Sequence, residues 1–340
     1  MKTLRAAMKA RSATRRFEPT QEESFEEALI GAPGYDGGVR AIVIGSAAGG
    51  GFPQWNCGCP NCVGVREGRA GLTGRTQDSL AVTADGERFA LVNASPDILA
   101  QIKATPALWP RAPRHTPIGA IVLTNGDMDH VLGLFSLRES QPLALYATPP
   151  VWKGLEASIL VRTLQRFEGQ VVFRPLVIGE EVELRDAAGA SLGLHVRPFA
   201  APGKLPVHLV GHAAESPEDN VGLVIREARS PAAPTLAYAA ACASASDVDL
   251  AGHAAVLFDG TFFREDELVR LGLSKAVAKD MAHMPISGDR GSLAGLASLR
   301  ARKIYTHINN TNPILGPSEE RRAVEAAGWE VAFDGMEITP

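Results

Sequence analysis

Short apolar runs rich in β-branched residues recur through the chain, and several of them end in a polar cluster. IVLT at 121–124 precedes NGDMDH, VLF at 256–258 precedes DG, and KIY at 303–305 precedes THINN. Apolar runs of this length and composition are typical of buried strands. Polar residues that directly follow strands usually lie in loops at one edge of a sheet, where α/β proteins place their sites. The pattern therefore predicts a layered α and β structure with a functional edge.

From residue 39 onwards such strands alternate with groups of helices, which predicts one α/β (α+β layered) domain over 39–340. Residues 1–38 differ, because six basic and no acidic residues among the first 16 give way to an acidic stretch and a Gly-rich end. We expect a disordered or weakly helical N-terminal tail there, with an organelle-type targeting segment as the alternative. No apolar segment follows the basic residues, which argues against a secretory signal.

Composition excludes several classes of function. The chain is 45% hydrophobic and 21% charged, with a net charge of −4, as in an ordinary globular protein. Charge this close to balance gives no electrostatic reason to expect nucleic acid or an anionic membrane as a partner. No apolar run approaches the roughly 18 residues that span a bilayer. We therefore expect a cytoplasmic protein without membrane insertion, and a homodimer is left open.

Three of the four cysteines form a C-x-C-x-x-C motif, Cys57, Cys59 and Cys62. Clustered thiols in a reducing compartment usually indicate a metal, and three thiolates on a tight loop can fill three corners of a tetrahedral structural zinc site. Cys242 or a group near His307 is a candidate for the fourth corner. Buried or redox-active cysteines without metal are the alternative. The glycines before the motif lack the spacings of nucleotide-binding loops, which disfavours that function.

The loop after IVLT offers Asp129 beside His130 on a rigid base. The alternative is a helix start, with Asp127 or Asp129 as the N-cap and His130 in the first turn. His307 ends a later strand among asparagines, which is unusual company for a core histidine. Together Asp129, His130 and His307 would provide one carboxylate and two imidazoles, a set that suits non-haem Fe(II) with positions left open.

Two more polar residues belong near this set. Asp259 ends the strand VLFD, and His283 lies in MAHMPISG. We expect Asp259 to act as a ligand or to orient a ligand. Taken alone, each of His283 and His307 is more typical of a hydrogen-bonded structural residue than of a ligand.

In chain order the sequence contains the segments GSAAGGGFPQWNCGCPNC, RTQDSLAV, NASPDI, LTNGDMDHVLGL, FDGT and THINNTNPIL. Together, over about 39–340, they resemble one known family, the pyrroloquinoline quinone (PQQ) biosynthesis protein B family. That family belongs to the metallo-β-lactamase superfamily. The resemblance therefore implies a four-layer αββα sandwich with a CxCxxC zinc-loop insert.

The superfamily's H-x-H-x-D-H metal loop falls on residues 125–130. By resemblance Asp129 and His130 are metal ligands, and His307 is the ligand after the late strand. Asn125 and Asp127 stand where two histidines would bind a first zinc. The bridging aspartate expected near TLAYAAAC is also absent from the sequence. These departures favour one metal over a two-zinc centre.

Two further roles follow from the resemblance. His283 matches a catalytic or ligand-orienting histidine of related nucleases and phosphodiesterases. In relatives with the same cysteine insert, the fourth zinc ligand lies three residues after the late histidine, which here is Asn310. Asp127, Asp259 and His283 are thus candidates for proton transfer or for orienting ligands.

The resemblance implies a role in making PQQ from a peptide that contains Glu and Tyr. The favoured reaction is Fe(II)- and O₂-dependent hydroxylation of the tyrosine ring in a cross-linked Glu–Tyr intermediate, with other PQQ-pathway proteins as further partners. One rival is a zinc-dependent hydrolase that uses the same ligands. Another is a carrier that binds or moves the quinone or its precursor.

Overall fold

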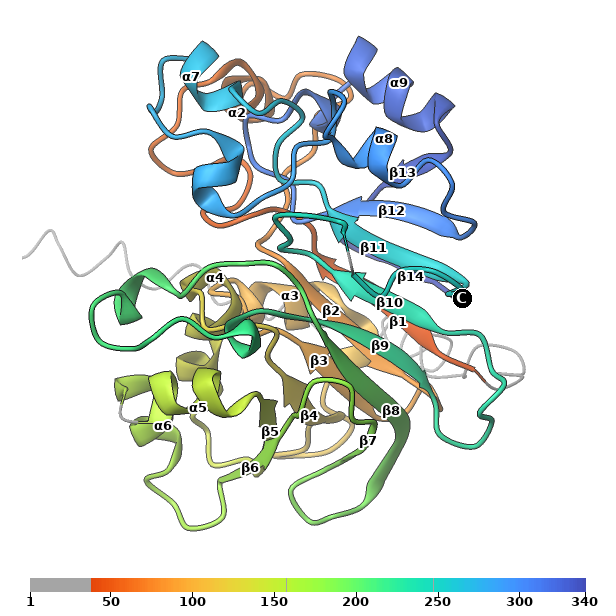
Figure 1. The fold of residues 1–340 in the computed structure, drawn as a ribbon. Coiled ribbons are helices and arrows are strands. Elements are labelled where there is room, and N and C mark those ends of the chain that lie inside the picture. The colour runs from red at the N-terminus through yellow and green to blue at the C-terminus, as the bar shows by residue number, and fades with distance from the viewer. Residues whose placement is uncertain (1–37, 157, 247) are drawn as a thin grey trace, which may run out of the picture. The chain divides into compact units, whose positions relative to one another are not determined.

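Two seven-stranded sheets pack face to face in the part of the chain that the structure describes (Figure 1). This computed structural model describes residues 38–156, 158–246 and 248–340. The tail predicted over residues 1–38 therefore lies outside the described residues, apart from Gly38. Its predicted disorder stays a prediction.

The first sheet has the strand order β14-β1-β2-β3-β4-β5-β6. Its strands are β1 (Arg40–Gly45), β2 (Ser79–Thr83), β3 (Phe89–Val92), β4 (Ile118–Val122), β5 (Leu143–Ala147), β6 (Val171–Pro175) and β14 (Met336–Ile338). Asp85-Gly86 between two apolar runs is a sequence signal typical of a hairpin. The structure confirms it, because β2 and β3 pair antiparallel and Gly86 has a φ of 73°. From β3 to β6 the strands run parallel, so β3 and β4 end at the same edge of the sheet.

The second sheet has the order β13-β12-β11-β10-β9-β8-β7. Its strands are β7 (Val182–Arg185), β8 (Ser191–Ala200), β9 (Val221–Glu227), β10 (Leu236–Ala239), β11 (Ala255–Asp259), β12 (Arg302–Thr306) and β13 (Trp329–Val331). Strands β10 to β13 are parallel, which brings the residues that follow β11 and β12 to one edge. Asp259, the last residue of β11, and His307 lie at this edge.

Helices cover the outer face of each sheet (Figure 1). They are α2 (Pro60–Arg66), α3 (Ile98–Ala104), α4 (Met128–Val131), α5 (Pro149–Glu156), α6 (Ile159–Leu164), α7 (Glu267–Arg270), α8 (Ser292–Gly295) and α9 (Glu319–Ala326). One apolar cluster lies between the sheets, with Val82 and Leu223 among its members. Separate clusters join α3, α5 and α6 to the first sheet and α2 and α9 to the second. This is the predicted αββα layering.

The helix after β3 begins later than its sequence suggests. Ser95-Pro96 predicts an N-cap followed by a first helical residue, whereas α3 begins at Ile98. The Ser95 hydroxyl accepts the backbone N–H of Asp97 at 3.3 Å and donates to Gln101 at 3.1 Å. The serine therefore stabilises a local turn that delays the helix by two residues.

Candidate metal centre

Asp129, His130 and His307 meet at the shared edge of the sheets. His307 Nε2 lies 3.2 Å from Asp129 Oδ2, and His130 Nε2 lies 4.0 Å from the same oxygen. One ligand atom from each residue lies within 4.8 Å of the other two. Both imidazoles are buried, whereas Asp129 is partly exposed. The three side chains are thus placed to hold one metal ion that remains accessible from one side.

Local backbone geometry sets this arrangement. Asn125 Oδ1 accepts the backbone N–H of Asp127 at 3.0 Å, and Asp127 adopts an extended conformation as the residue before α4. The helix starts at Met128, so Asp129 and His130 project from its first turn. His307 directly follows β12 with a φ of 55°, a left-handed conformation that is rare for residues other than glycine and often marks a functional position.

The buried Nε2 atom of His130 is available to bind a metal ion. This atom has no hydrogen-bond partner within the described ranges. A buried polar atom without a partner costs free energy of about 1–3 kcal/mol. A metal ion held jointly with Asp129 and His307 would satisfy it. The residues present therefore fit a metal ion.

The electrostatic environment also favours a cation. Burial raises the pKa of Asp129, but the charge of His130 and the hydrogen bond from His307 outweigh it and hold the pKa well below its usual range. Burial lowers the pKa of His307, yet the bond to Asp129 and its charge raise it to about 9. Burial likewise raises the pKa of Asp259, while the charge and hydrogen bond of His283 bring it below its ordinary value. Both carboxylates are therefore ionised at neutral pH.

Asp259 and His283 form a second group that shares His307. His283 Nδ1 lies 2.6 Å from Asp259 Oδ2 and 3.0 Å from the Thr261 hydroxyl. That hydroxyl donates to the His307 carbonyl at 3.0 Å and lies 2.9 Å from His307 Nδ1. Because a hydroxyl has only one proton to donate, His307 Nδ1 is the donor in this last contact. In the neutral His307 ring, Nε2 is therefore free to bind a metal.

Asn125 and Asp127 lie in the same loop but belong to neither group of candidate ligands in the described chain. The Asn125 amide donates to Asn220 Oδ1 at 3.0 Å and so is directed towards β9. Asp127 is partly exposed at the start of α4. Of the two positions that would carry histidines in a two-zinc loop, Asn125 thus has a buried structural contact and Asp127 faces the surface at the start of α4.

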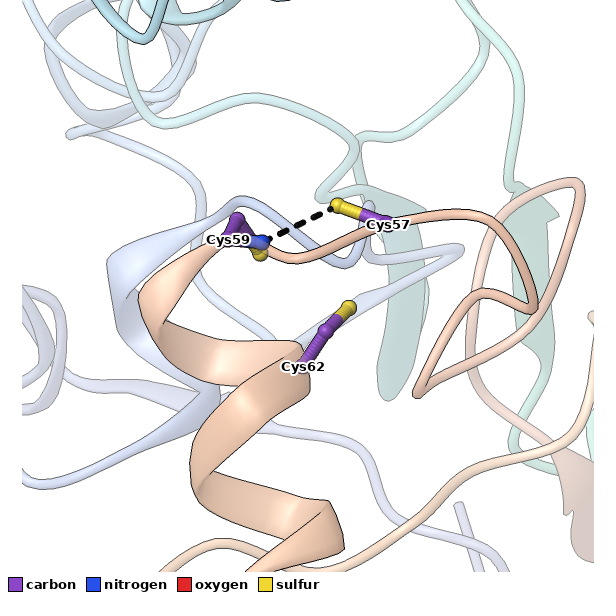
Figure 2. A group of neighbouring side chains, drawn as sticks. All are labelled: Cys57, Cys59 and Cys62. Carbon is purple, nitrogen blue, oxygen red and sulfur yellow. Dashed lines mark hydrogen bonds between the residues drawn. The ribbon is translucent and has the colours of Figure 1, made fainter.

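The cysteine motif forms a third group of candidate ligands. Cys57, Cys59 and Cys62 lie where the chain enters α2, and Figure 2 shows their side chains gathered around one point. Cys59 and Cys62 are buried, and the Cys59 backbone N–H donates to Cys57 Sγ at 3.4 Å. Three sulfurs within 4.8 Å of one another match three corners of a structural zinc site.

Asn310 completes the surroundings of the three thiols. Its side-chain nitrogen lies 3.1, 3.6 and 3.3 Å from the three sulfurs in chain order. Cys242 instead donates its S–H to the Ser244 carbonyl at 2.9 Å, and its backbone N–H donates to Asp259 at 2.8 Å. Of the two residues considered for the fourth position, the structure therefore brings Asn310 to the cluster, and Cys242 lies outside it.

Two threonines that the sequence did not single out contact the candidate ligands. Thr261 bridges His283 and His307, and Thr124 Oγ1 lies 3.4 Å from His130 Nδ1. Thr124 is the last residue of the predicted strand IVLT, and Thr261 lies in FDGT, just after the predicted strand VLFD. The motifs show where these threonines lie along the chain, but not their hydrogen-bonding role.

The fold and the ligand groups at its edge define a class of protein. Residues 88–308 match the Beta-lactamase superfamily domain. A diphosphatase of the PhnP family is 21% identical, with a TM-score of 0.60, over 88% of this chain and 96% of its own, which supports the fold alone. The predicted metallo-β-lactamase sandwich is confirmed.

Closer relatives narrow this class to a family. Coenzyme PQQ synthesis protein B of Methylobacterium nodulans is 46% identical over 88% of this chain and 99% of its own length. The crystal structure of Zn²⁺-bound PqqB from Methylobacterium extorquens is 40% identical, with a TM-score of 0.81, and covers 88% of this chain and 100% of its own. The chain belongs to the coenzyme PQQ synthesis protein B family, as its motifs predict.

Proposed function

We propose that the protein acts in PQQ synthesis as an Fe(II)- and O₂-dependent hydroxylase. Its substrate is a peptide-derived intermediate in which a glutamate and a tyrosine are cross-linked. One oxygen atom replaces a ring hydrogen as hydroxyl, and the other leaves as water after an external reductant supplies two electrons. The observation that carries the proposal is the grouping of Asp129, His130 and His307, in which His130 Nε2 has no hydrogen-bond partner among the described residues. Two histidines and one carboxylate are the ligand set of non-haem Fe(II) oxygenases.

The chain's own residues have distinct tasks in this proposal. Asp129, His130 and His307 would hold the iron, which when bound supplies the activation of O₂. His283 donates Nδ1–H to Asp259, which leaves its Nε2 as a proton acceptor for the substrate. Asp259 fixes the orientation of the His283 ring through this hydrogen bond. Asp127, partly exposed before α4, is proposed to exchange protons with solvent.

A zinc-dependent hydrolase is the second candidate function. It is favoured by the zinc-bound state of the relative from Methylobacterium extorquens. Zinc would use the same ligands and would act on bound water in place of O₂. Two imidazoles and one carboxylate hold catalytic zinc in some hydrolases as well as iron in oxygenases, so the need for O₂ is what separates the two candidate functions.

We also propose a structural zinc at Cys57, Cys59 and Cys62, with Asn310 as the fourth neighbour. The oxygen and nitrogen of an asparagine amide exchange places when the group turns by half a rotation. That turn puts Oδ1 where Nδ2 now faces the three sulfurs. An oxygen ligand is compatible with zinc.

The proposed function is tested by metal reconstitution. Protein prepared without oxygen or metal is loaded with Fe(II) or with Zn(II), and each form is given the Glu–Tyr intermediate and a reductant, with and without O₂. Hydroxylation only with Fe(II) and O₂ supports the proposal. Turnover with Zn(II) in the absence of O₂ supports the hydrolase. A carrier would instead be supported if no metal form turned over the intermediate and if the protein bound the quinone tightly even after the substitution Asp129→Ala.

A further inference from the structure

A chain of buried hydrogen bonds runs from Asp78 to His130 beneath the metal centre. The Tyr238 hydroxyl donates to Asp78, and Asn93 Nδ2 donates to the Tyr238 oxygen at 3.3 Å. The Thr124 hydroxyl donates to Asn93 Oδ1 at 3.0 Å, and Thr124 Oγ1 lies 3.4 Å from His130 Nδ1. All five side chains are at most 4% exposed. This series of hydrogen bonds joins the two sheets, since Tyr238 lies in β10 and Asn93 follows β3.

The direction of the hydrogen bonds is fixed at Asn93. Its Oδ1 accepts the backbone N–H of Thr124 at 3.1 Å, and since a backbone N–H only donates, this atom is the amide oxygen. An amide oxygen only accepts, so the single hydroxyl proton of Thr124 is directed to it. Thr124 Oγ1 can then only accept from His130 Nδ1. The proton of a neutral His130 ring is therefore on Nδ1.

At the other end of this series of hydrogen bonds, their direction is fixed by Asp78. Its second oxygen accepts the Thr306 hydroxyl at 3.0 Å, so both carboxylate oxygens are acceptors. Burial and the Asp78 charge raise the pKa of Tyr238 well above its usual value, which keeps the phenolic proton in place as a donor. Asn93 takes a φ of 64°, a conformation that asparagine tolerates better than most residues. This backbone geometry lets its amide contact Thr124 and Tyr238 at once.

We propose that Asp78, Tyr238, Asn93 and Thr124 form a positioning relay that keeps His130 in its Nδ1–H tautomer. The relay presents an unprotonated Nε2 to the metal. Metal-binding histidines commonly donate their other N–H to a partner of this kind, and loss of such a partner weakens metal binding by about 10–100-fold. The relay gives a role to the RTQDSLAV and NASPDI motifs, which hold Asp78 and Asn93. It rests on the proposed metal role of His130 and is independent of oxygen chemistry.

The relay is tested by Thr124→Val, which keeps the side-chain shape and removes the acceptor for His130 Nδ1. Thr124→Ser is the matched control, because it keeps the hydroxyl. The first measurement is the affinity for Mn(II). This metal prefers carboxylate and imidazole ligands to thiolates and so reports on this site. The second measurement is the two-bond ¹⁵N–¹H correlation of histidine-labelled, metal-free protein at alkaline pH, with His130 assigned from its loss in His130→Gln.

We expect the Nδ1–H tautomer of His130 in the wild type and in Thr124→Ser. In Thr124→Val the Nε2–H form should appear, and Mn(II) should bind about 10–100-fold more weakly. An Nε2–H tautomer in the wild type would overturn the relay, and this readout holds even when the valine variant does not fold. If Thr124→Val kept the Nδ1–H tautomer and bound Mn(II) as tightly as the wild type does, the relay would also be overturned. Failure of the wild type to bind Mn(II), with the Nδ1–H tautomer present, would contradict the proposed metal site and leave the relay standing.

Discussion

At the scale of single residues, the two histidines of the candidate centre are held in the same way. His130 Nδ1 contacts the Thr124 hydroxyl at 3.4 Å, and His307 Nδ1 contacts the Thr261 hydroxyl at 2.9 Å. Each ring therefore keeps Nε2 on the side of Asp129. The carboxylate of Asp129 is the one negative group that both Nε2 atoms approach within 4.0 Å in the described residues. Its charge should decide whether a metal binds.

The substitution Asp129→Asn tests this role. It removes the charge and keeps the shape, so we expect Mn(II) or Fe(II) affinity to fall by more than about a hundredfold, beyond the usual effect of an outer-shell partner. Asp127→Asn in the same loop is the matched control and should keep the metal, because Asp127 lies outside the ligand group. Metal titration followed by metal analysis gives the answer. Equal losses in the two variants would show that loop charge, not ligation, matters.

The sequence motifs pointed to the candidate ligands but not to the residues that hydrogen-bond to them. Asp129, His130 and His307 follow strand ends, but their spacing did not show that they meet. The family motifs grouped them, and the structure brings the three side chains together. Thr124 and Thr261 could not be grouped in this way, because a threonine after a strand is common and the direction of its proton depends on groups that are distant in sequence. The choice between Cys242 and Asn310 likewise depended on which segment folds against the cysteines.

At the scale of elements, the cysteine loop is attached to the segment that carries His307. The Asn61 side chain donates to the carbonyls of Asn310 and Asn312 at 3.2 and 3.0 Å. A zinc ion at the cysteines would add a further link between α2 and the residues after β12. Such a metal would thereby stabilise the segment that carries the candidate ligand His307.

The substitution Cys59→Ser tests this link. We expect loss of the structural zinc, a lower free energy of unfolding and less soluble protein, because structural zinc contributes directly to folding. Cys242→Ser is the control, since Cys242 is also buried but lies outside the cluster. Zinc content and urea unfolding are measured for both. Normal stability with stoichiometric zinc in Cys59→Ser would refute the structural site.

A second element-scale prediction concerns the close approach of the turn after α4 to the segment after β3. A Cβ atom on Gly133 would lie 2.2 Å from the Ser95 carbonyl oxygen. We therefore expect Gly133→Ala to reduce the free energy of unfolding by about 1–3 kcal/mol, as overpacking does. In Gly295→Ala the new Cβ would meet the flexible end of Met284 at 3.3 Å, and the change should stay below about 1 kcal/mol. Urea unfolding compares the two, and equal effects would contradict the steric argument.

At the scale of the whole molecule, the strand pattern was enough to predict layered α and β structure. Apart from the hairpin of β2 and β3, it did not predict how the strands pair, because pairing between distant segments is set by packing across both sheets. The particular αββα sandwich came from the family motifs, and the superfamily match confirms it. None of the described helices has the length and apolar character needed to cross a membrane. A cytoplasmic location, a homodimer and contacts with other PQQ-pathway proteins stay predictions.

The central claim, oxygen insertion at an iron held by Asp129, His130 and His307, has a direct test. Anaerobic Fe(II)-loaded protein is given the cross-linked Glu–Tyr intermediate, a reductant and ¹⁸O₂, and the product is analysed by mass spectrometry. We predict one ¹⁸O atom in the tyrosine ring for each hydroxylation, and none with the Asp129→Asn variant. An unlabelled product, or no oxygen incorporation by protein that demonstrably holds iron at these ligands, would contradict the account.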